Sequence, residues 1–231
     1  MGELASVNVG RPLQIGVSRR GRPVISAIGK IPVTRRVAVR GINLEGDDQA
    51  DRSVHGGPDK AVYAYASEDI AWWTTVLGLE LEPGAFGENL TTARVDISGA
   101  VIGERWQVGS TELEVCQPRQ PCSKLGVAFG DPGMVRRFAH AGRPGAYLRI
   151  KREGDLGAGD HVQVLTRPGH GITIETVARA ILTDSTLLSF AADAPALPRS
   201  RLSLPRGCAN GQPRPTRDDR LAATEALYGG H

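Results

Sequence analysis

Residues 104–125, ERWQVGSTELEVCQPRQPCSKL, contain two short apolar segments and then a stretch stiffened by two prolines. The segments 104–108 and 113–116 have the composition of β-strands, with a glycine between them. Comparable short runs, separated by Gly and Pro, occur at 7–9, 13–17, 24–25, 33–39, 61–65, 146–151 and 161–165. Many short strands with glycine turns and few helices predict a small, partly closed β-barrel.

Helical patterns are few in the first part of the chain. Ser67, followed by two acidic residues, is expected to be the N-cap of a helix that Gly78 ends. A second helix is expected from Asp131-Pro132 to Gly142. The fold class is therefore mainly β with some α.

Strand character is lost after residue 168. Residues 173–204 have helical spacing, with Asp184 and Pro198 as expected helix starts. Residues 205–215 are rich in Pro, Gly and Arg, and 216–227 have the capping pattern of a final helix. We expect a β-barrel domain over 1–168, then a small helical C-terminal domain with an irregular tail over 169–231.

The proline-stiffened stretch ends in Cys122. Pro118 and Pro121 fix their own φ and push the residues before them toward extended geometry. Arg119 and Lys124 flank the cysteine, and neighbouring positive charge favours the thiolate. A thiolate can be a nucleophile or a soft metal ligand. The alternative is a buried, inert cysteine.

A second polar stretch lies at His55-Gly56-Gly57. The glycines permit close approach of the backbone to a ligand, and Lys60 with Arg119 could neutralise an anion beside backbone N–H groups. A plain tight turn is the alternative. Residues 41–47 and 86–92 are also rich in Gly and polar groups, although Asn89 in the latter could bond only its own backbone.

Composition excludes several classes of protein. The 231 residues are 40% hydrophobic and 23% charged, without an apolar run of the roughly 20 residues that span a bilayer. A net charge of +3 is too small to indicate nucleic-acid binding. The three cysteines do not form a disulfide framework or a zinc motif. The N-terminus lacks a secretory signal pattern, so we expect a cytoplasmic location, neither in a membrane nor on nucleic acid.

The polar segments described above, taken together and in their order along the chain, resemble those of the MOSC family. This family is named for the C-terminal part of molybdenum-cofactor sulfurase. The likeness is to standalone bacterial members with a small three-helix C-terminal domain, and it covers about residues 8–205. The matching segments are 44–51, 55–62, 86–92, 102–103 and 117–125.

The resemblance implies a β-barrel that binds a pterin-based molybdenum cofactor. Cys122 would be the molybdenum ligand and, with His55, a catalytic residue. The residues expected to bind the cofactor are Gly56, Gly57, Lys60, Asn89, Arg119 and Lys124. The implied reaction is reduction of N-hydroxylated small molecules of the hydroxylaminopurine or amidoxime type. Electrons would come from a separate flavin or iron–sulfur reductase.

Two other hypotheses remain. Cys122 could carry sulfur as a persulfide for metal–sulfur cluster assembly, or the fold could have lost its chemistry. Pyridoxal phosphate is not expected, because Lys60 and Lys124 are more simply cations for an anionic ligand. Glycines and prolines interrupt the expected third helix of the C-terminal domain, where Cys208 is an oxidation liability. The sequence does not indicate an oligomeric state.

Overall fold

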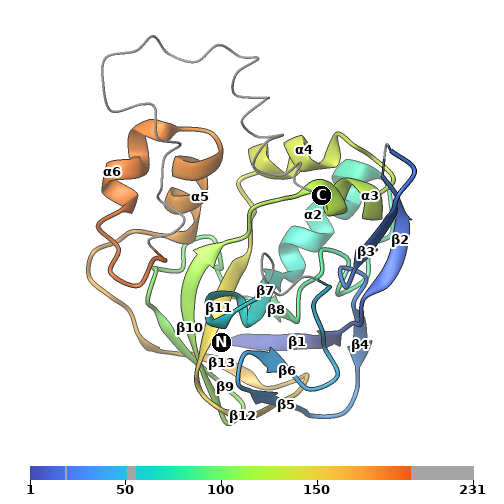
Figure 1. The fold of residues 1–231 in the computed structure, drawn as a ribbon. Coiled ribbons are helices and arrows are strands. Elements are labelled where there is room, and N and C mark those ends of the chain that lie inside the picture. Colours follow the sequence, from blue (N-terminus) through green and yellow to red (C-terminus); the bar gives the residue numbers. More distant parts are fainter. Residues whose placement is uncertain (19, 51–55, 199–231) are drawn as a thin grey trace.

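The computed structural model describes residues 1–18, 20–50 and 56–198 and contains a closed barrel of seven strands (Figure 1). Around the ring they are β13 (His161–Thr166), β9 (Arg105–Val108), β10 (Thr111–Pro118), β11 (Ala146–Arg152), β7 (Val62–Ala66), β8 (Leu90–Ala93) and β1 (Gly2–Val9). β1 pairs back with β13 and so closes the ring, while β7 and β8 are parallel. The predicted fold class is confirmed, with a barrel more complete than expected.

Three smaller β structures surround the ring. β4 (Ile31–Val33) pairs with β1, and β2 (Leu13–Val17) forms a hairpin with β3 (Pro23–Ser26). A further sheet consists of β12 (Gly154–Leu156), β5 (Val37–Arg40) and β6 (Asn43–Leu44). The predicted single run 33–39 is therefore wrong. Its middle, 34–36, is exposed and lies between strands of two different sheets.

Alternating side chains fill the barrel. In β10, Leu113 and Val115 are fully buried, whereas Glu112 and Glu114 point to partly exposed surroundings. Trp106 of β9, paired with Leu113, joins the same core. Burial of each large apolar side chain contributes about 1.5–3 kcal/mol, so period-2 alternation is what selects the strands.

The helices packed on the barrel differ in detail from the prediction. They are η1 (Pro58–Lys60), α2 (Ser67–Leu77), α3 (Ser123–Ala128) and α4 (Met134–His140). Ser67 is not the N-cap of α2. Ala66 holds that position, and the Ser67 hydroxyl donates to the neighbouring Glu68 carboxylate instead. Gly78 does end the helix in the left-handed conformation, with φ of 64°.

The second predicted helix begins later than expected. α4 starts at Met134, because the Asp131 carboxylate accepts the N–H of Gly133 and closes a turn before the helix. α3 was not predicted at all. Its six residues give too short a pattern for helical periodicity to register.

The C-terminal segment packs on the same core as the barrel. It contains α5 (Ile174–Leu182), η2 (Ser185–Leu187) and α6 (Leu188–Ala191). Asp184 accepts the N–H of Thr186 at the start of η2, as expected. Ile174 and Val177 belong to the barrel's hydrophobic cluster. The boundary at residue 168 stays a prediction; the expected helix at 216–227 and Cys208 lie outside the described residues.

None of the helices within the described ranges has the length and apolar character needed to cross a bilayer.

Candidate functional site

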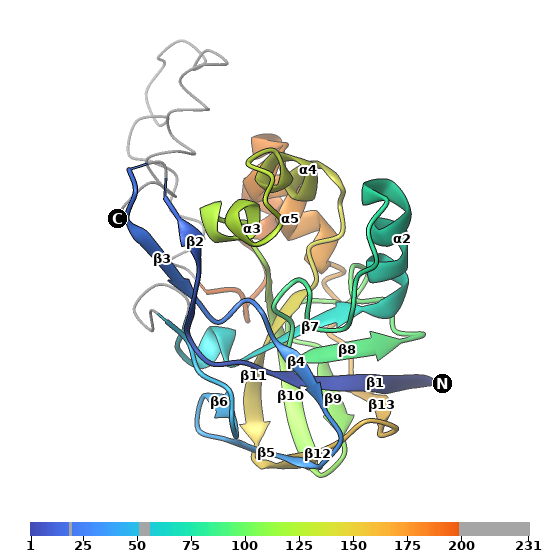
Figure 2. The same ribbon diagram turned by 90° about the vertical axis from the view of Figure 1, so that its right-hand side faces the viewer.

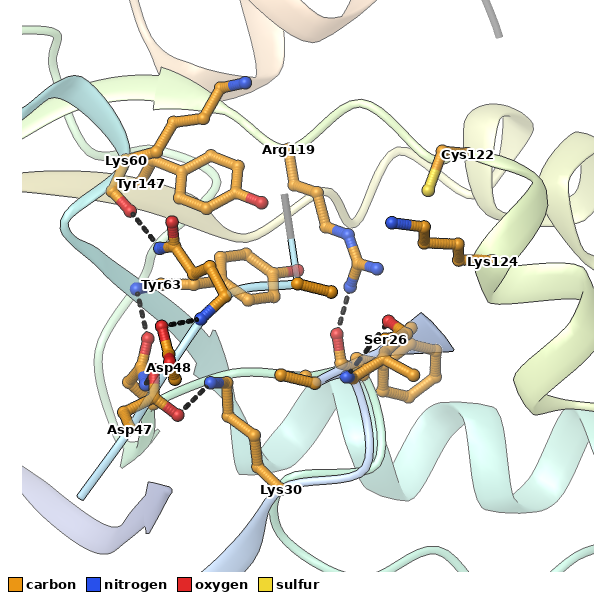
Figure 3. Close-up of a pocket in the computed structure, with 17 residues that line it drawn as sticks. Ser26, Lys30, Asp47, Asp48, Lys60, Tyr63, Arg119, Cys122, Lys124 and Tyr147 are labelled. Carbon is orange, nitrogen blue, oxygen red and sulfur yellow. Dashed lines mark hydrogen bonds and ion pairs between the residues drawn. The ribbon is translucent and has the colours of Figure 1, made fainter. Parts of the chain in front are cut away.

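Five of the predicted site residues line one pocket (Figure 3). They are Lys60, Asn89, Arg119, Cys122 and Lys124. Lys60 ends η1, Asn89 precedes β8, and the other three surround the turn between β10 and α3. The structure therefore brings together chemistry from three distant parts of the chain. The ligand that each residue contacts stays a prediction.

The two described cysteines have different surroundings. Cys122 is half-buried at the pocket wall and is the N-cap residue of α3, with extended backbone at φ −129° and ψ 172°. Cys116 lies fully inside the barrel wall, and burial raises the pKa of its thiol to about 12. Cys122 is thus accessible from the pocket, and Cys116 is a packing residue.

Arg119 is a buried cation in the pocket wall. Only 7% of the residue is exposed, and its guanidinium donates to the carbonyl oxygen of Phe86. The guanidinium carbon lies 5.1 Å from the centre of the Tyr63 ring and 5.6 Å from that of Phe138. Such contacts favour a desolvated guanidinium. Burial alone would lower the pKa of Arg119, but ionisable neighbours, including Cys122, raise it by more than burial lowers it. The positive charge of Arg119 is therefore permanent.

A layer of aromatic side chains packs against this arginine. Tyr63, Tyr65, Trp73, Phe86 and Phe138 pack together between the barrel and the helices. Tyr63 donates its hydroxyl to the carbonyl of Pro144, and Trp73 donates to the hydroxyl of Tyr65, both at 2.9 Å. Because the polar ends of these rings are hydrogen-bonded, the layer is a fixed platform.

Asn89 has a clear positioning role. Its Oδ1 accepts the N–H of Tyr63 at 3.1 Å, and its Nδ2 donates to Asp47 Oδ2 at 2.9 Å and to the carbonyl of Asn8 at 3.4 Å. Asp47 is also the ion-pair partner of Lys30 beside the pocket. Burial lowers the pKa of Lys30, against the opposing effect of Asp47. Asn89 therefore ties the strand below the pocket to this ion pair.

The turn before β8 is held by Glu88, which is fully buried. Its carboxylate accepts N–H groups of Gly84 at 2.5 Å and Phe86 at 3.1 Å, and the Thr91 hydroxyl at 3.0 Å. This turn positions the Phe86 carbonyl that Arg119 contacts. Gly87 has φ of +75°, and an added Cβ would lie 3.0 Å from Ile28, so the position requires glycine.

The remaining predicted residues lie elsewhere or outside the described part. Gly57 is at the N-terminus of η1 with φ of 96°, and its carbonyl accepts the N–H of Lys60. Gly56 precedes it, and neither glycine is among the described residues that line the pocket. His55 lies outside the described residues.

Several lining residues were not predicted from the sequence. They include Lys30, Asp48, Tyr63 and Tyr147. Tyr63 and Tyr147 face each other across β7 and β11, with ring centres 5.1 Å apart. The sequence of a strand does not show which residue lies opposite on the neighbouring strand, so the contact between these two tyrosines could not be predicted. Asp48 lies in the matching segment 44–51, although it was not among the predicted site residues.

Comparison with known proteins gives the family. The family model described as "MOSC domain" matches residues 51–163. The uncharacterized protein YflK of Bacillus subtilis is 36% identical over 80% of this chain and 82% of its own length. The chain belongs to the MOSC domain family.

Two further proteins are similar to this MOSC protein, one in structure and one in sequence. The crystal structure of YiiM from Geobacillus stearothermophilus has a TM-score of 0.70 and 28% identity, covering 88% of this chain and all of that one. A protein of Gibberella moniliformis named "Reductase" is 31% identical over 88% of this chain, but the match spans only 36% of its own length. Most of that larger protein has no counterpart in this match.

Proposed function

We propose that this MOSC protein binds a molybdenum–pterin cofactor in the pocket and reduces N-hydroxylated small molecules. MOSC domains are associated with the molybdenum cofactor in general. The observation that carries the proposal is the meeting of Cys122 with Lys60, Lys124 and Arg119 in one pocket. The protein of Gibberella moniliformis whose printed name is "Reductase" supports the class of reaction.

The donor set of the pocket fits such a cofactor. A thiolate is a soft ligand suited to a metal with sulfur ligands, and Cys122 is the described thiol on the pocket wall. Three cations that line the same pocket suit the negative charge of a phosphate-bearing pterin. Cys122 would hold the metal, and Lys60, Lys124 and Arg119 would hold the anionic part.

The protein's own contribution is position and electrostatics. Arg119 cannot move far, because its guanidinium is fixed by the Phe86 carbonyl and stacked near Tyr63. A fixed charge costs no reorganisation when a ligand binds. Tyr63, Tyr147 and Phe86 give the wall an apolar part that suits a flat organic substrate.

The reaction has a simple balance. The substrate's N–O bond breaks, two electrons and two protons are consumed, and water is released together with an amine from a hydroxylamine or an amidine from an amidoxime. The cofactor would supply the two-electron chemistry at the N–O bond. The electrons would come from a separate protein.

The direct test is metal and pterin analysis of the protein made in a host that synthesises the cofactor. We expect about one molybdenum per chain in the wild type and none in Cys122→Ala. Cys116→Ala is the matched control, because it removes a buried thiol and should retain the metal. The loaded wild type, but not Cys122→Ala, should reduce benzamidoxime with reduced methyl viologen as electron donor.

Other results would favour other functions. Equal, negligible molybdenum in the wild type and Cys122→Ala would contradict the proposal. Sulfide released by dithiothreitol from the wild type but not from Cys122→Ala would then favour the persulfide carrier.

A further inference from the structure

The positive charge of this chain is concentrated in one segment. Residues 4–44 contain eight Lys or Arg and no Asp or Glu, although the whole chain has a net charge of only +3. Four of these cations have acidic partners from other segments. The pairs are Lys30 with Asp47, Arg35 with Glu45, Arg36 with Asp155 and Asp160, and Arg40 with Glu153.

The remaining described cations of this segment lie in the β2–β3 hairpin or next to it. Arg11 precedes β2, and Arg20 and Arg22 lie in the turn between its two strands. All three are exposed, and no ion pair joins them to another residue of the described part. Both ends of the hairpin therefore carry positive charge that no ion pair within the described residues neutralises.

One face of the same hairpin is apolar and exposed. The register pairs Gln14 with Ile25 and Val17 with Pro23, so these side chains share a face. Val17 is 60% exposed and Ile25 is 44% exposed. A two-stranded hairpin is only marginally stable in isolation. An exposed apolar face on such a hairpin therefore indicates a surface that another molecule covers.

The opposite face of the hairpin packs against α3. Gly16 lies so close to α3 that an added Cβ would be 2.8 Å from Val127 Cγ1. β3 ends at Ser26, and Ser26, Ala27 and Ile28 line the pocket. In Figure 2 the hairpin extends from the barrel beside α3, the helix that begins after Cys122. Whatever covers the hairpin therefore lies at the edge of the pocket.

We propose that the β2–β3 hairpin is the docking surface for an acidic electron-transfer protein. The proposal rests on the proposed function, because each N–O bond reduced requires two electrons from outside the chain. The donor's flavin or iron–sulfur centre is oxidised as these electrons are delivered. A carrier docked at Val17 and Ile25, with acidic groups against Arg20 and Arg22, would bring that centre next to the pocket.

The composition of the surface favours this occupant over others. An apolar centre with arginines at the rim is typical of protein–protein interfaces. Nucleic acid would favour basic groups with aromatic side chains, and the described hairpin residues include no aromatic. Residues 199–231 contain six Arg and three acidic residues, so charge does not favour the chain's own C-terminal segment.

Direct binding tests the surface independently of activity. Titration with a flavodoxin and with a [2Fe–2S] ferredoxin, both acidic, should show binding of the wild type by at least one of them. Affinity should fall about tenfold between 50 and 300 mM salt, because exposed charges are screened. Arg20→Glu/Arg22→Glu should bind about tenfold more weakly. Arg179→Glu on α5, on the other side of the molecule in Figure 1, should bind as the wild type does.

Three results would overturn the docking surface. They are no binding of either acidic protein, equal binding by Arg20→Glu/Arg22→Glu, and hairpin-dependent binding of a short DNA duplex or of phosphatidylglycerol vesicles in their place.

Activity separates this proposal from the proposed function. With flavodoxin or ferredoxin as donor, Arg20→Glu/Arg22→Glu should lose about tenfold in benzamidoxime reduction, whereas with methyl viologen it should match the wild type. Equal loss with both donors would contradict docking. A wild type inactive with methyl viologen would contradict the proposed function, while the binding result would still decide the docking surface.

Discussion

The ammonium group of Lys30 and the carboxylate of Asp47 form an ion pair whose side chains are only 7% and 1% exposed. Lys30 lies between β3 and β4, and Asp47 follows β6. Asp47 also accepts N–H groups from Gly10 and from the side chain of Asn89. The pair and its hydrogen bonds therefore join four segments, of which those of Lys30, Asp47 and Asn89 line the pocket.

Removal of one partner should be costly. Lys30→Met leaves the Asp47 carboxylate buried without its cation, and we expect unfolding in urea to show a loss of about 3 kcal/mol. The double variant Lys30→Met/Asp47→Asn should regain at least about 1 kcal/mol, because the buried charge is gone. Arg36→Met, which breaks the more exposed ion pairs with Asp155 and Asp160, should cost at most about 1 kcal/mol. Wild-type stability in Lys30→Met would refute the importance of the pair.

The two described thiols should differ sharply in reactivity. In a Cys208→Ser background, we expect iodoacetamide at pH 7.5 to alkylate Cys122 at least about 100-fold faster than Cys116. Cys116 is buried and its pKa is raised to about 12, so its thiolate is scarce and inaccessible. Mass spectrometry of tryptic peptides over time measures both rates. Comparable rates in the folded protein would mean that the barrel wall opens at Cys116.

Lys124 should draw anions to Cys122. The ratio of alkylation rates for anionic iodoacetate and neutral iodoacetamide reports the local field at the thiol. We expect this ratio to fall about threefold or more in Lys124→Gln. Lys151→Gln is the control, because Lys151 lies on β11 beside Glu114 and does not line the pocket. A ratio that falls equally in both variants would indicate net charge rather than the pocket.

The sequence predicted the barrel and five members of the pocket because those features leave local patterns. In β10, polar and apolar residues alternate along the sequence as burial does in the structure. The prolines on either side of Arg119 indicate the turn that carries Cys122. The glycine-rich stretch before β8 likewise pointed to Asn89. What the sequence did not reveal is how the residues interact. That Asn89 contacts a ligand stays a prediction, and nothing in the sequence indicates that its amide hydrogen-bonds to Tyr63, Asp47 and Asn8.

The overlooked features depend on contacts between distant segments. Lys30 and Asp47 are 17 positions apart and pair through loops with no regular pattern. Glu88 looked like one polar residue in a turn, and its buried position follows only from the packing of β8 in the barrel. Short elements such as α3 are also missed, because a helix of six residues contains fewer than two turns and therefore fewer than two repeats of the apolar pattern.

Glu88 should give the protein a measurable pH dependence. Burial raises the pKa of its carboxyl above 4.5, so the folded protein binds more protons than the unfolded chain between 4.5 and the raised value. The contribution of Glu88 to stability therefore falls as the pH rises through that window, and the penalty is complete above it. Urea unfolding from pH 4.5 to 8 should show this fall in the wild type.

Two variants isolate the effect of Glu88. In Glu88→Gln, position 88 no longer titrates, so the stability difference between wild type and variant should shrink as the pH rises. Thr91→Val removes a hydrogen bond that lowers the pKa of Glu88, so the fall should extend to higher pH. A difference between wild type and Glu88→Gln that does not change with pH would show that Glu88 has the same pKa in the folded and unfolded chains.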